Sequence, residues 1–220
     1  MKALLIADVE CKALWDYYTP ERLEGVDVII ACGDLKRHYL EFLVTMGSRP
    51  LLYVPGNHDG RYQTQPPEGC ENIDDAVYVF RGVRFLGLGG SRRYNTESPY
   101  QYTEAEMLSR IQHLRRQIKK VGGIDVVVTH AAPAGLGDQE DLAHRGFDCF
   151  KKLMEEYRPL YFVHGHVHMN YGNIPRLMNY GNTQVVNAYE RYILELPDGQ
   201  KPLREGFLTY RRRKNAVITR

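Results

Sequence analysis

Short runs of consecutive apolar residues recur along the chain and alternate with longer amphipathic stretches. Four of these runs read Leu-Leu-Ile-Ala, Val-Ile-Ile-Ala, Leu-Leu-Tyr-Val and Val-Val-Val-Thr. Uninterrupted apolar positions over so few residues are typical of strands that are buried on both faces. The pattern predicts strands at residues 2–7, 27–32, 50–54, 83–88, 125–129 and 159–163.

Helical spacing appears between these strands. Residues 39–46 and 147–157 predict short helices, and residues 103–121 predict a long one. The long helix begins with Thr103 and Glu106 at the spacing of a capping box, and Gly122 follows its end. After residue 171 short strands with Gly and Asn turns take over, and 183–188 and 191–196 predict an antiparallel meander. The expected fold class is α/β, with parallel strands first and an antiparallel tail.

Composition allows one sizeable domain. The chain has 220 residues, of which 43% are hydrophobic and 25% charged, as in ordinary globular proteins. The net charge of +2 is too small to indicate nucleic acid, and no apolar run approaches the roughly 20 residues of a membrane helix, so no membrane partner is expected. The four cysteines form no CxxC pair, which favours a reducing, cytoplasmic compartment. We expect a single domain at 1–200 and a basic tail at 201–220.

Five of the predicted strands end near a residue that can bind a metal ion. These residues are Asp8, Asp34, Asn57, His130, His166 and His168. Because the carboxyl ends of parallel strands share one edge of a sheet, we expect these side chains to lie together. Carboxylate, amide oxygen and imidazole are the ligand set for Mn, Fe, Zn or Ni rather than for thiolate sites. Gly33, Gly56 and Gly165 precede ligands, where a missing side chain lets the backbone approach closely.

Each residue alone has a plainer interpretation. An Asp after a strand is usually a turn residue or a helix cap. His38, His113 and His144 are interpreted as ordinary surface or core histidines, and His164 as a buried, hydrogen-bonded one. The occurrence of all five strand ends in this order favours the metal site.

In this order the segments resemble the motifs of calcineurin-like metallophosphoesterases. They read Asp8-Val9-Glu10, Gly33-Asp34, Gly56-Asn57-His58-Asp59, His130 and Gly165-His166-Val167-His168, and the resemblance covers residues 1–196. It implies a four-layer αββα sandwich that holds two divalent metal ions. One ion would take Asp8, Asp34, His168 and residue 10, and the other Asp34, Asn57, His130 and His166, with Asp34 bridging. A hydroxide bound by both metals would attack phosphorus in line, and His58 would protonate the leaving group.

Glu10 departs from this pattern, because the family usually has a histidine at that position. If Glu10 ligates the first metal, directly or through water, the site becomes more anionic and should prefer Mn²⁺ or Mg²⁺ over Zn²⁺. If it does not, the first site is weak. We expect ligation, with manganese as the metal and iron, zinc, nickel or magnesium as alternatives.

The substrate is indicated less directly. Protein phosphatases of the family continue Gly-Asp into Asp-Arg-Gly, whereas this chain continues into Leu35 and Lys36, which disfavours a phosphoprotein. Residues 129–138 resemble the segment of small cytosolic members related to cyclic-nucleotide phosphodiesterases. A phosphodiester is therefore favoured over a small phosphomonoester. Arg92 and Arg93 are candidates to hold the phosphate, although a solvated loop arginine is the plainer interpretation.

Three questions stay open at this level. Asp59 either orients the His58 ring or caps a turn. The basic run Arg211-Arg212-Arg213-Lys214 keeps a nuclease as an alternative, with nucleic acid a partner that is not favoured. A metal-binding interaction scaffold with weak catalysis is the second alternative, because Glu10 replaces a ligand. Nothing in the sequence indicates the oligomeric state.

Overall fold

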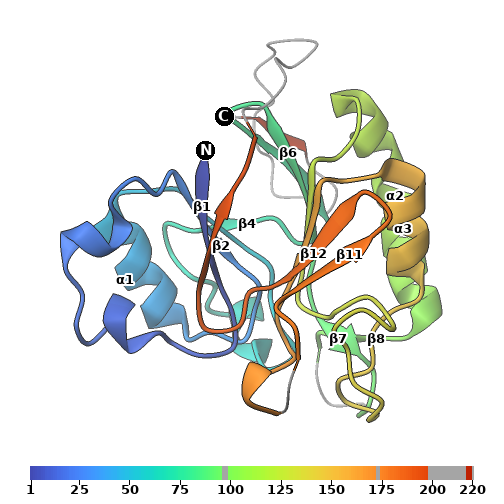
Figure 1. Cartoon of the computed structure of the whole chain (residues 1–220), viewed down its shortest axis with the longest axis horizontal. Coiled ribbons are helices and arrows are strands. Elements are labelled where there is room, and N and C mark those ends of the chain that lie inside the picture. Colours follow the sequence, from blue (N-terminus) through green and yellow to red (C-terminus); the bar gives the residue numbers. More distant parts are fainter. Residues whose placement is uncertain (96–98, 172–173, 198–216, 220) are drawn as a thin grey trace.

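Two β-sheets stacked face to face form the centre of the molecule in a computed structural model, which describes residues 1–95, 99–171, 174–197 and 217–219 (Figure 1). The first sheet has the order β13 (Tyr192–Glu195), β1 (Lys2–Ile6), β2 (Val28–Ala31), β3 (Leu51–Tyr53) and β4 (Glu71–Asn72). The second has the order β11 (Leu177–Tyr180), β12 (Thr183–Asn187), β10 (Tyr161–His164), β9 (Val126–Thr129), β6 (Val83–Leu88), β5 (Ala76–Phe80) and β14 (Val217–Thr219). A small ribbon pairs β7 (Ser91–Arg92) with β8 (Gln101–Tyr102).

Helices cover the outer face of each sheet (Figure 1). The helix α1 (Arg37–Gly47) lies beside the first sheet, and α2 (Glu104–Val121) and α3 (Cys149–Tyr157) lie beside the second. Short 3₁₀ helices are η1 (Lys12–Leu14), η2 (Pro20–Leu23), η3 (Gly60–Gln63) and η4 (Met169–Tyr171). The order of layers is therefore helix, sheet, sheet, helix, which is the predicted αββα sandwich.

Three apolar clusters fill the spaces between these layers. Leu5 and Ile30 of the first sheet meet Val128 of the second in the cluster between the sheets. Their sequence neighbours Leu4 and Ile29 point the other way, toward α1. A strand buried on both faces needs apolar residues at every position, which explains the uninterrupted runs. The remaining cluster joins the second sheet to α2 and α3.

The long helix begins and ends as the sequence predicts. The Thr103 hydroxyl accepts a hydrogen bond from the Glu106 backbone N–H at 3.2 Å, and a Glu106 carboxylate oxygen accepts from the Thr103 backbone N–H at 2.7 Å. Gly122 ends the helix in the left-handed conformation. The reciprocal bonds satisfy N–H groups that have no partner within the helix.

The predicted meander is wrong. The strands β12 and β13 do not pair, because β12 lies between β10 and β11 in the second sheet while β13 pairs with β1 in the first. The antiparallel partner of β12 is β11, which the sequence pattern did not predict, and that of β13 is β1. The strand β5, also not predicted, pairs antiparallel with β6. The β5–β6 hairpin turns at Arg81 and Gly82, both with positive φ, so a tight turn forms without the usual Asn-Gly signal.

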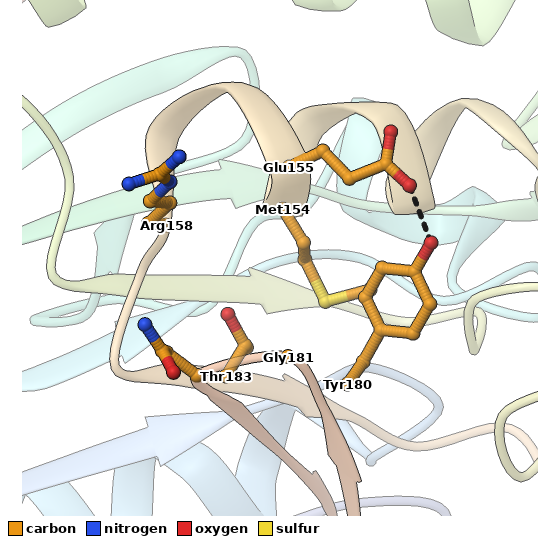
Figure 2. A pocket seen from close by; sticks show the side chains of 7 residues that line it. Met154, Glu155, Arg158, Tyr180, Gly181 and Thr183 are labelled. Atoms are coloured by element: carbon orange, nitrogen blue, oxygen red, sulfur yellow. Dashed lines mark hydrogen bonds between the residues drawn. The ribbon is translucent and has the colours of Figure 1, made fainter.

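The face beyond α3 carries a pocket that contains none of the predicted site residues. It lies between the end of α3 and the β11–β12 turn, where the Tyr180 hydroxyl donates a hydrogen bond to the Glu155 carboxylate (Figure 2). This bond ties the edge strand β11 to α3.

The C-terminal region is described only in part. The basic run Arg211–Lys214 lies outside the described residues, so the predicted division at residue 200 stays a prediction. Residues 217–219, within the predicted tail, pair with β5 as the parallel strand β14. No helix in the described ranges is long and apolar enough to cross a bilayer.

Candidate metal centre

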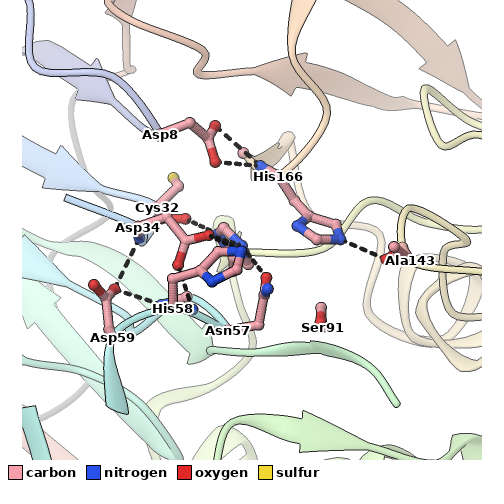
Figure 3. A network of polar contacts seen from close by, with 12 residues as sticks. Asp8, Cys32, Asp34, Asn57, His58, Asp59, Ser91, Ala143 and His166 are labelled. Carbon is pink, nitrogen blue, oxygen red and sulfur yellow. Dashed lines mark hydrogen bonds and ion pairs between the residues drawn. The ribbon is translucent and has the colours of Figure 1, made fainter. Parts of the chain in front are cut away.

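The carboxyl ends of five parallel strands from both sheets meet at one edge of the sandwich. Asp8, Asp34 and Asn57 follow β1, β2 and β3 of the first sheet, while His130 and His166 follow β9 and β10 of the second. Backbone bonds join these ends: the Asp8 N–H donates to the Gly33 carbonyl at 3.1 Å, and the Gly165 N–H donates to the His130 carbonyl at 3.0 Å. Figure 3 shows the resulting network of polar contacts.

Three of the predicted ligands adopt a positive φ that non-glycine residues rarely take. They are Asp8 at 65°, Asp34 at 55° and His166 at 67°. The Val9 N–H donates a hydrogen bond to the Ala7 carbonyl at 2.7 Å, and the Val167 N–H donates to the Gly165 carbonyl at 2.8 Å. Asp8 and His166 are therefore the central residues of two γ-turns. Such strain is concentrated at functional sites, where surrounding structure holds it in place.

The glycines beside these ligands permit the close approach that the sequence analysis expects. A Cβ placed on Gly56 would lie 2.0 Å from Asp34 Oδ1, and one on Gly33 would lie 2.7 Å from His130 Nδ1. A Cβ on Gly165 would lie 2.9 Å from Asp8 Oδ2. No side chain fits at any of the three positions without displacing a predicted ligand.

His130 is fully buried with one nitrogen tied to the backbone. Its Nδ1 lies 2.7 Å from the Cys32 carbonyl oxygen, which can only accept, so Nδ1 carries a proton. The other nitrogen, Nε2, lies 2.9 Å from Asn57 Oδ1 and 3.3 Å from Asp34 Oδ2. In neutral imidazole Nε2 then presents a lone pair to two other acceptors.

Several lone pairs that point toward one place favour the binding of a cation there. Asp34, His130 and His166 offer ligand atoms that all lie within 4.8 Å of one another. Burial lowers the pKa of His130, but the charge and hydrogen bond of Asp34, together with the charge of Asp8, outweigh burial and raise the pKa to about 9. The residues present therefore fit a divalent metal, with Nδ1 of His130 fixed by a backbone carbonyl as metal-binding histidines usually are.

His166, like His130, has one ring nitrogen bonded to a backbone carbonyl. Its Nε2 lies 2.7 Å from the Ala143 carbonyl oxygen, which leaves Nδ1 for a metal (Figure 3). Burial lowers the pKa of His166 to about 3, so the ring is neutral. The His166 backbone N–H donates to both carboxylate oxygens of Asp8 at 3.0 Å, which links the two sheets.

The pKa values of the Asp8 and Asp34 carboxylates are shifted in opposite directions. Burial is the first cause that raises the pKa of Asp8 to about 7, and the nearby charge of Asp34 adds to it. Burial would also raise the pKa of Asp34, but His130 outweighs burial and lowers the pKa to about 2. Adjacent buried carboxylates of this kind are stabilised by a cation between them.

Asp59 supports the backbone of the site rather than the His58 ring. One of its carboxylate oxygens accepts from the Asp34 N–H at 2.8 Å and from the Gly56 N–H at 2.7 Å. It therefore fixes the turns that precede two predicted ligands. Of the two roles that the sequence left open for Asp59, these contacts favour the turn carboxylate.

His58 stands at the open side of the centre. Its side chain is 74% exposed, and its Nε2 lies 4.0 Å from Asp34 Oδ2. The His58 backbone N–H donates to the other oxygen, Asp34 Oδ1, at 2.8 Å. The ring can thus reach a group bound beside Asp34 while remaining accessible to solvent.

Asp8, Glu10 and His168 are not among the three residues whose ligand atoms cluster in the described part of the chain. The His168 ring packs against Tyr189 with centroids 5.0 Å apart. Glu10 is 26% exposed, and its Oε1 accepts from the Lys36 N–H at 3.2 Å and lies 3.7 Å from Lys36 Nζ. Asp8 and Glu10 lie beyond β1, which ends at Ile6, and the chain turns at Asp8.

His164 is the buried, hydrogen-bonded histidine that the sequence analysis favours. Its ring is 1% exposed, its Nδ1 lies 2.9 Å from the Gly165 carbonyl oxygen, and burial lowers its pKa to about 4. It is the last residue of β10, so His166 and His168 lie beyond the strand and do not share its alternation.

Arg92 and Arg93 are held by carboxylates of α2. Arg92 Nη1 lies 3.3 Å from Glu104 and donates to the Gly146 carbonyl at 3.0 Å. Arg93 Nη2 donates to both carboxylate oxygens of Glu106, at 2.9 and 3.0 Å. These pairs hold the β7–β8 loop against α2, and binding of a phosphate by either arginine stays a prediction.

Two residues outside the predicted site lie at the centre: Tyr94, which the sequence did not single out, and His144, which was interpreted as an ordinary histidine. The Tyr94 hydroxyl accepts a hydrogen bond from Asn57 Nδ2 at 3.0 Å. The His144 ring, held by Asp141 at 2.9 Å, lies 5.0 Å from the His166 ring between centroids. Both belong to irregular loops that carry no periodic signal, so the sequence pattern could not identify them.

Comparison with known proteins gives one family. The family model described as calcineurin-like phosphoesterase matches residues 3–170. The chain is 25% identical over 205 residues to an uncharacterized protein of Methanocaldococcus jannaschii, covering 87% of this chain and 84% of that one. It is also 25% identical to a UPF0046 protein of Caenorhabditis elegans, covering 77% of this chain and 66% of the relative.

Two solved structures share the fold. The crystal structure of TT1561 from Thermus thermophilus superposes with a TM-score of 0.58 at 17% identity, covering 86% of this chain and 89% of that one. The structure of GAP50, the anchor in the inner membrane complex of Plasmodium, gives a TM-score of 0.50 at 12% identity, covering 85% and 70%. At these identities the likeness concerns the fold alone.

Proposed function

The chain belongs to the calcineurin-like phosphoesterase family of metal-dependent hydrolases, and we propose that it cleaves phosphodiesters in preference to small phosphomonoesters. The observation that carries the proposal is the convergence of Asp34, Asn57 and His130 lone pairs at the shared edge of the two sheets. Two divalent ions, manganese first among them, would supply Lewis acidity and an activated water there.

Each proposed metal position would take ligands from both sheets. Asp34 would serve both positions, Asn57, His130 and His166 would complete one, and Asp8, Glu10 and His168 would complete the other. Backbone carbonyls of Cys32 and Ala143 hold the two imidazoles, His130 and His166, in the tautomer that each role requires.

His58 is the general acid of the proposed reaction. Its exposed ring lies beside Asp34, on the open side where an ester oxygen would depart. A protonated imidazole can donate a proton to that oxygen as it departs.

The preference for a diester rests on charge. A phosphodiester carries one negative charge, whereas a monoester carries nearly two. Arg92 and Arg93, the predicted phosphate-binding residues, pair with Glu104 and Glu106, which reduces the positive charge available to balance a second negative charge on the substrate. The likeness of residues 129–138 to phosphodiesterase-related members supports the same choice.

A metal and substrate screen tests this function. Protein purified without chelator should contain divalent metal, and with Mn²⁺ it should hydrolyse bis-p-nitrophenyl phosphate faster than p-nitrophenyl phosphate. Asp34→Asn should lower the metal content of both positions and abolish hydrolysis, while Asn57→Ala should weaken one position only. No hydrolysis with Mn²⁺, Ni²⁺, Mg²⁺ or Zn²⁺ would exclude the function, and a faster monoester would exclude the diester preference.

His58→Ala tests the acid. We expect the kcat for a diester with a poor leaving group to fall by about 10²–10⁴, the usual contribution of a positioned acid, with metal content unchanged. The loss should shrink for p-nitrophenolate, which leaves without a proton. Equal losses for good and poor leaving groups would contradict the role.

A further inference from the structure

Tyr94 is held at a fixed place in the β7–β8 loop. Its backbone N–H donates to Gln101 Oε1 at 3.1 Å, and the Asn95 N–H donates to the same oxygen at 3.0 Å. The Gln101 side chain is buried, 3% exposed. Since Arg93 also ties the loop to Glu106, the segment that carries Tyr94 is fastened from both sides.

Within the described residues of this loop, the Tyr94 hydroxyl contacts the predicted ligand Asn57. Asn57 Nδ2 donates to it at 3.0 Å, while Asn57 Oδ1 faces His130 Nε2 at 2.9 Å. The two Asn57 atoms share one carbon, so one hydrogen bond joins the Tyr94 oxygen to the amide whose Oδ1 is a proposed metal ligand. The hydrogen bond also sets which end of the amide faces the imidazole.

The direction of this hydrogen bond leaves the Tyr94 O–H group free to act as a donor. Nδ2 is a donor only, so the Tyr94 oxygen accepts from it and the Tyr94 O–H proton points away from Asn57. Asn57 is the hydrogen-bond partner of this hydroxyl within the described residues. A half-buried hydroxyl beside a cation site, with its proton directed outward, is a donor for an anionic oxygen held at that cation.

We propose, on the basis of the proposed phosphoesterase function, that Tyr94 is a substrate-binding residue whose hydroxyl donates a hydrogen bond to a non-bridging phosphoryl oxygen. Asn57 orients the Tyr94 hydroxyl, and the hydrogen bonds to Gln101 Oε1 fix the backbone of Tyr94 and Asn95. A neutral donor adds a hydrogen bond without adding charge, which suits a monoanionic diester. Arg92 and Arg93 then serve to hold the loop that presents Tyr94.

Tyr94→Phe removes the hydroxyl and keeps the ring. We expect the KM for bis-p-nitrophenyl phosphate and the inhibition constant of inorganic phosphate to rise together by about 10–100-fold, the range for one lost hydrogen bond to a charged group. The manganese content and the kcat should change little, because the contact is made to the bound substrate as well as to the transition state.

Tyr180→Phe is the matched control. It removes the same hydroxyl from a tyrosine that also makes one side-chain hydrogen bond, to Glu155 in the pocket beyond α3 (Figure 2). It should leave the KM, phosphate inhibition and metal content as in the wild type.

Three results would overturn the proposal. One is an unchanged phosphate affinity in Tyr94→Phe. Another is a loss of manganese that accounts for the whole effect, because Tyr94 would then act only through Asn57. The third is an equal effect in Tyr180→Phe. If the wild type hydrolyses no ester, the phosphoesterase function fails, whereas calorimetric binding of inorganic phosphate to the manganese-loaded wild type and Tyr94→Phe still tests the Tyr94 contact.

Discussion

At the scale of single residues, the centre consists of side chains whose second polar atom is fixed. His130 and His166 each give one nitrogen to a backbone carbonyl, and Asn57 gives its amide nitrogen to Tyr94. Each is thereby left with one atom directed inward. A ligand that is held from behind loses less rotational freedom on binding a metal, so the geometry is set before the metal arrives.

Glu10 is the residue whose role is most open to test. We expect that its carboxylate serves the first metal even though Oε1 also accepts from the Lys36 N–H. Glu10→Ala should lose first-site metal while the second stays occupied. Glu10→His should raise activity with Zn²⁺ relative to Mn²⁺, because an imidazole makes the site less anionic.

The measurement for Glu10 is anomalous scattering from a metal-soaked crystal. A fully occupied first metal far from any Glu10 oxygen, with no water between them, would show that Glu10 only holds the Lys36 segment. In that case direct ligation at ~2.0–2.2 Å is absent, and Glu10→Ala should change loop order rather than metal content.

At the scale of elements, one buried ion cluster joins α2 to the second sheet and to the β7–β8 segment. Arg110 of α2 lies 2.6 Å from Asp74 and 2.8 Å from Asp75, and its guanidinium stacks on Tyr102 at 4.1 Å. It also donates to the Gly89 carbonyl at 2.9 Å. Burial raises the pKa of Asp74 and the Arg110 charge opposes that rise.

Arg110→Met should therefore cost far more stability than its position on a helix surface would suggest. We expect the free energy of unfolding to fall by about 3–5 kcal/mol in urea titrations, since Asp74 is left as a buried charge without its partner. Adding Asp74→Asn should restore part of the loss.

Arg115→Met provides the control on the same helix. Arg115 pairs with Glu156 at 2.8 Å, but its side chain is 56% exposed. Loss of such a surface pair should cost no more than about 1 kcal/mol. Similar losses for Arg110→Met and Arg115→Met would mean that the Asp74 cluster contributes no more than an ordinary surface pair.

At the scale of the whole molecule, the centre joins the two sheets. Asp8, Asp34 and Asn57 belong to one sheet, and His130 and His166 to the other. A metal bound there would crosslink the sandwich at one edge. It would also neutralise the carboxylates of Asp8 and Asp34, whose proximity contributes to the raised pKa of Asp8.

Metal removal should therefore lower the stability of the whole domain. A ligand at 100 times its Kd stabilises the folded state by about 2.7 kcal/mol. For a domain of this length that corresponds to a fall in Tm of about 5–10 °C after chelation. Calorimetric scans with EDTA and then with excess Mn²⁺ measure it, and Asp34→Asn should show no such response. Equal Tm values for chelated and manganese-loaded wild type would refute a metal that joins the sheets.

The sequence alone determined the features that follow from local pattern. Runs such as Leu4–Ile6 predicted doubly buried strands because every position in them faces one of two apolar layers. The proximity of Asp34, His130 and His166 could be predicted because each follows a strand and parallel strands end at one edge. The capping box of Thr103 and Glu106 is local and was predicted for the same reason.

Only the tertiary structure decided what depends on contacts between distant segments. The pairing of β12 and β13 with different sheets could not be predicted, because adjacent strands in the sequence need not be neighbours in space. The roles of Asp59, Arg92 and Tyr94 depend on partners far along the chain that no spacing reveals. Periodicity reports which face of an element is buried, and the packing of loops decides which polar atoms meet.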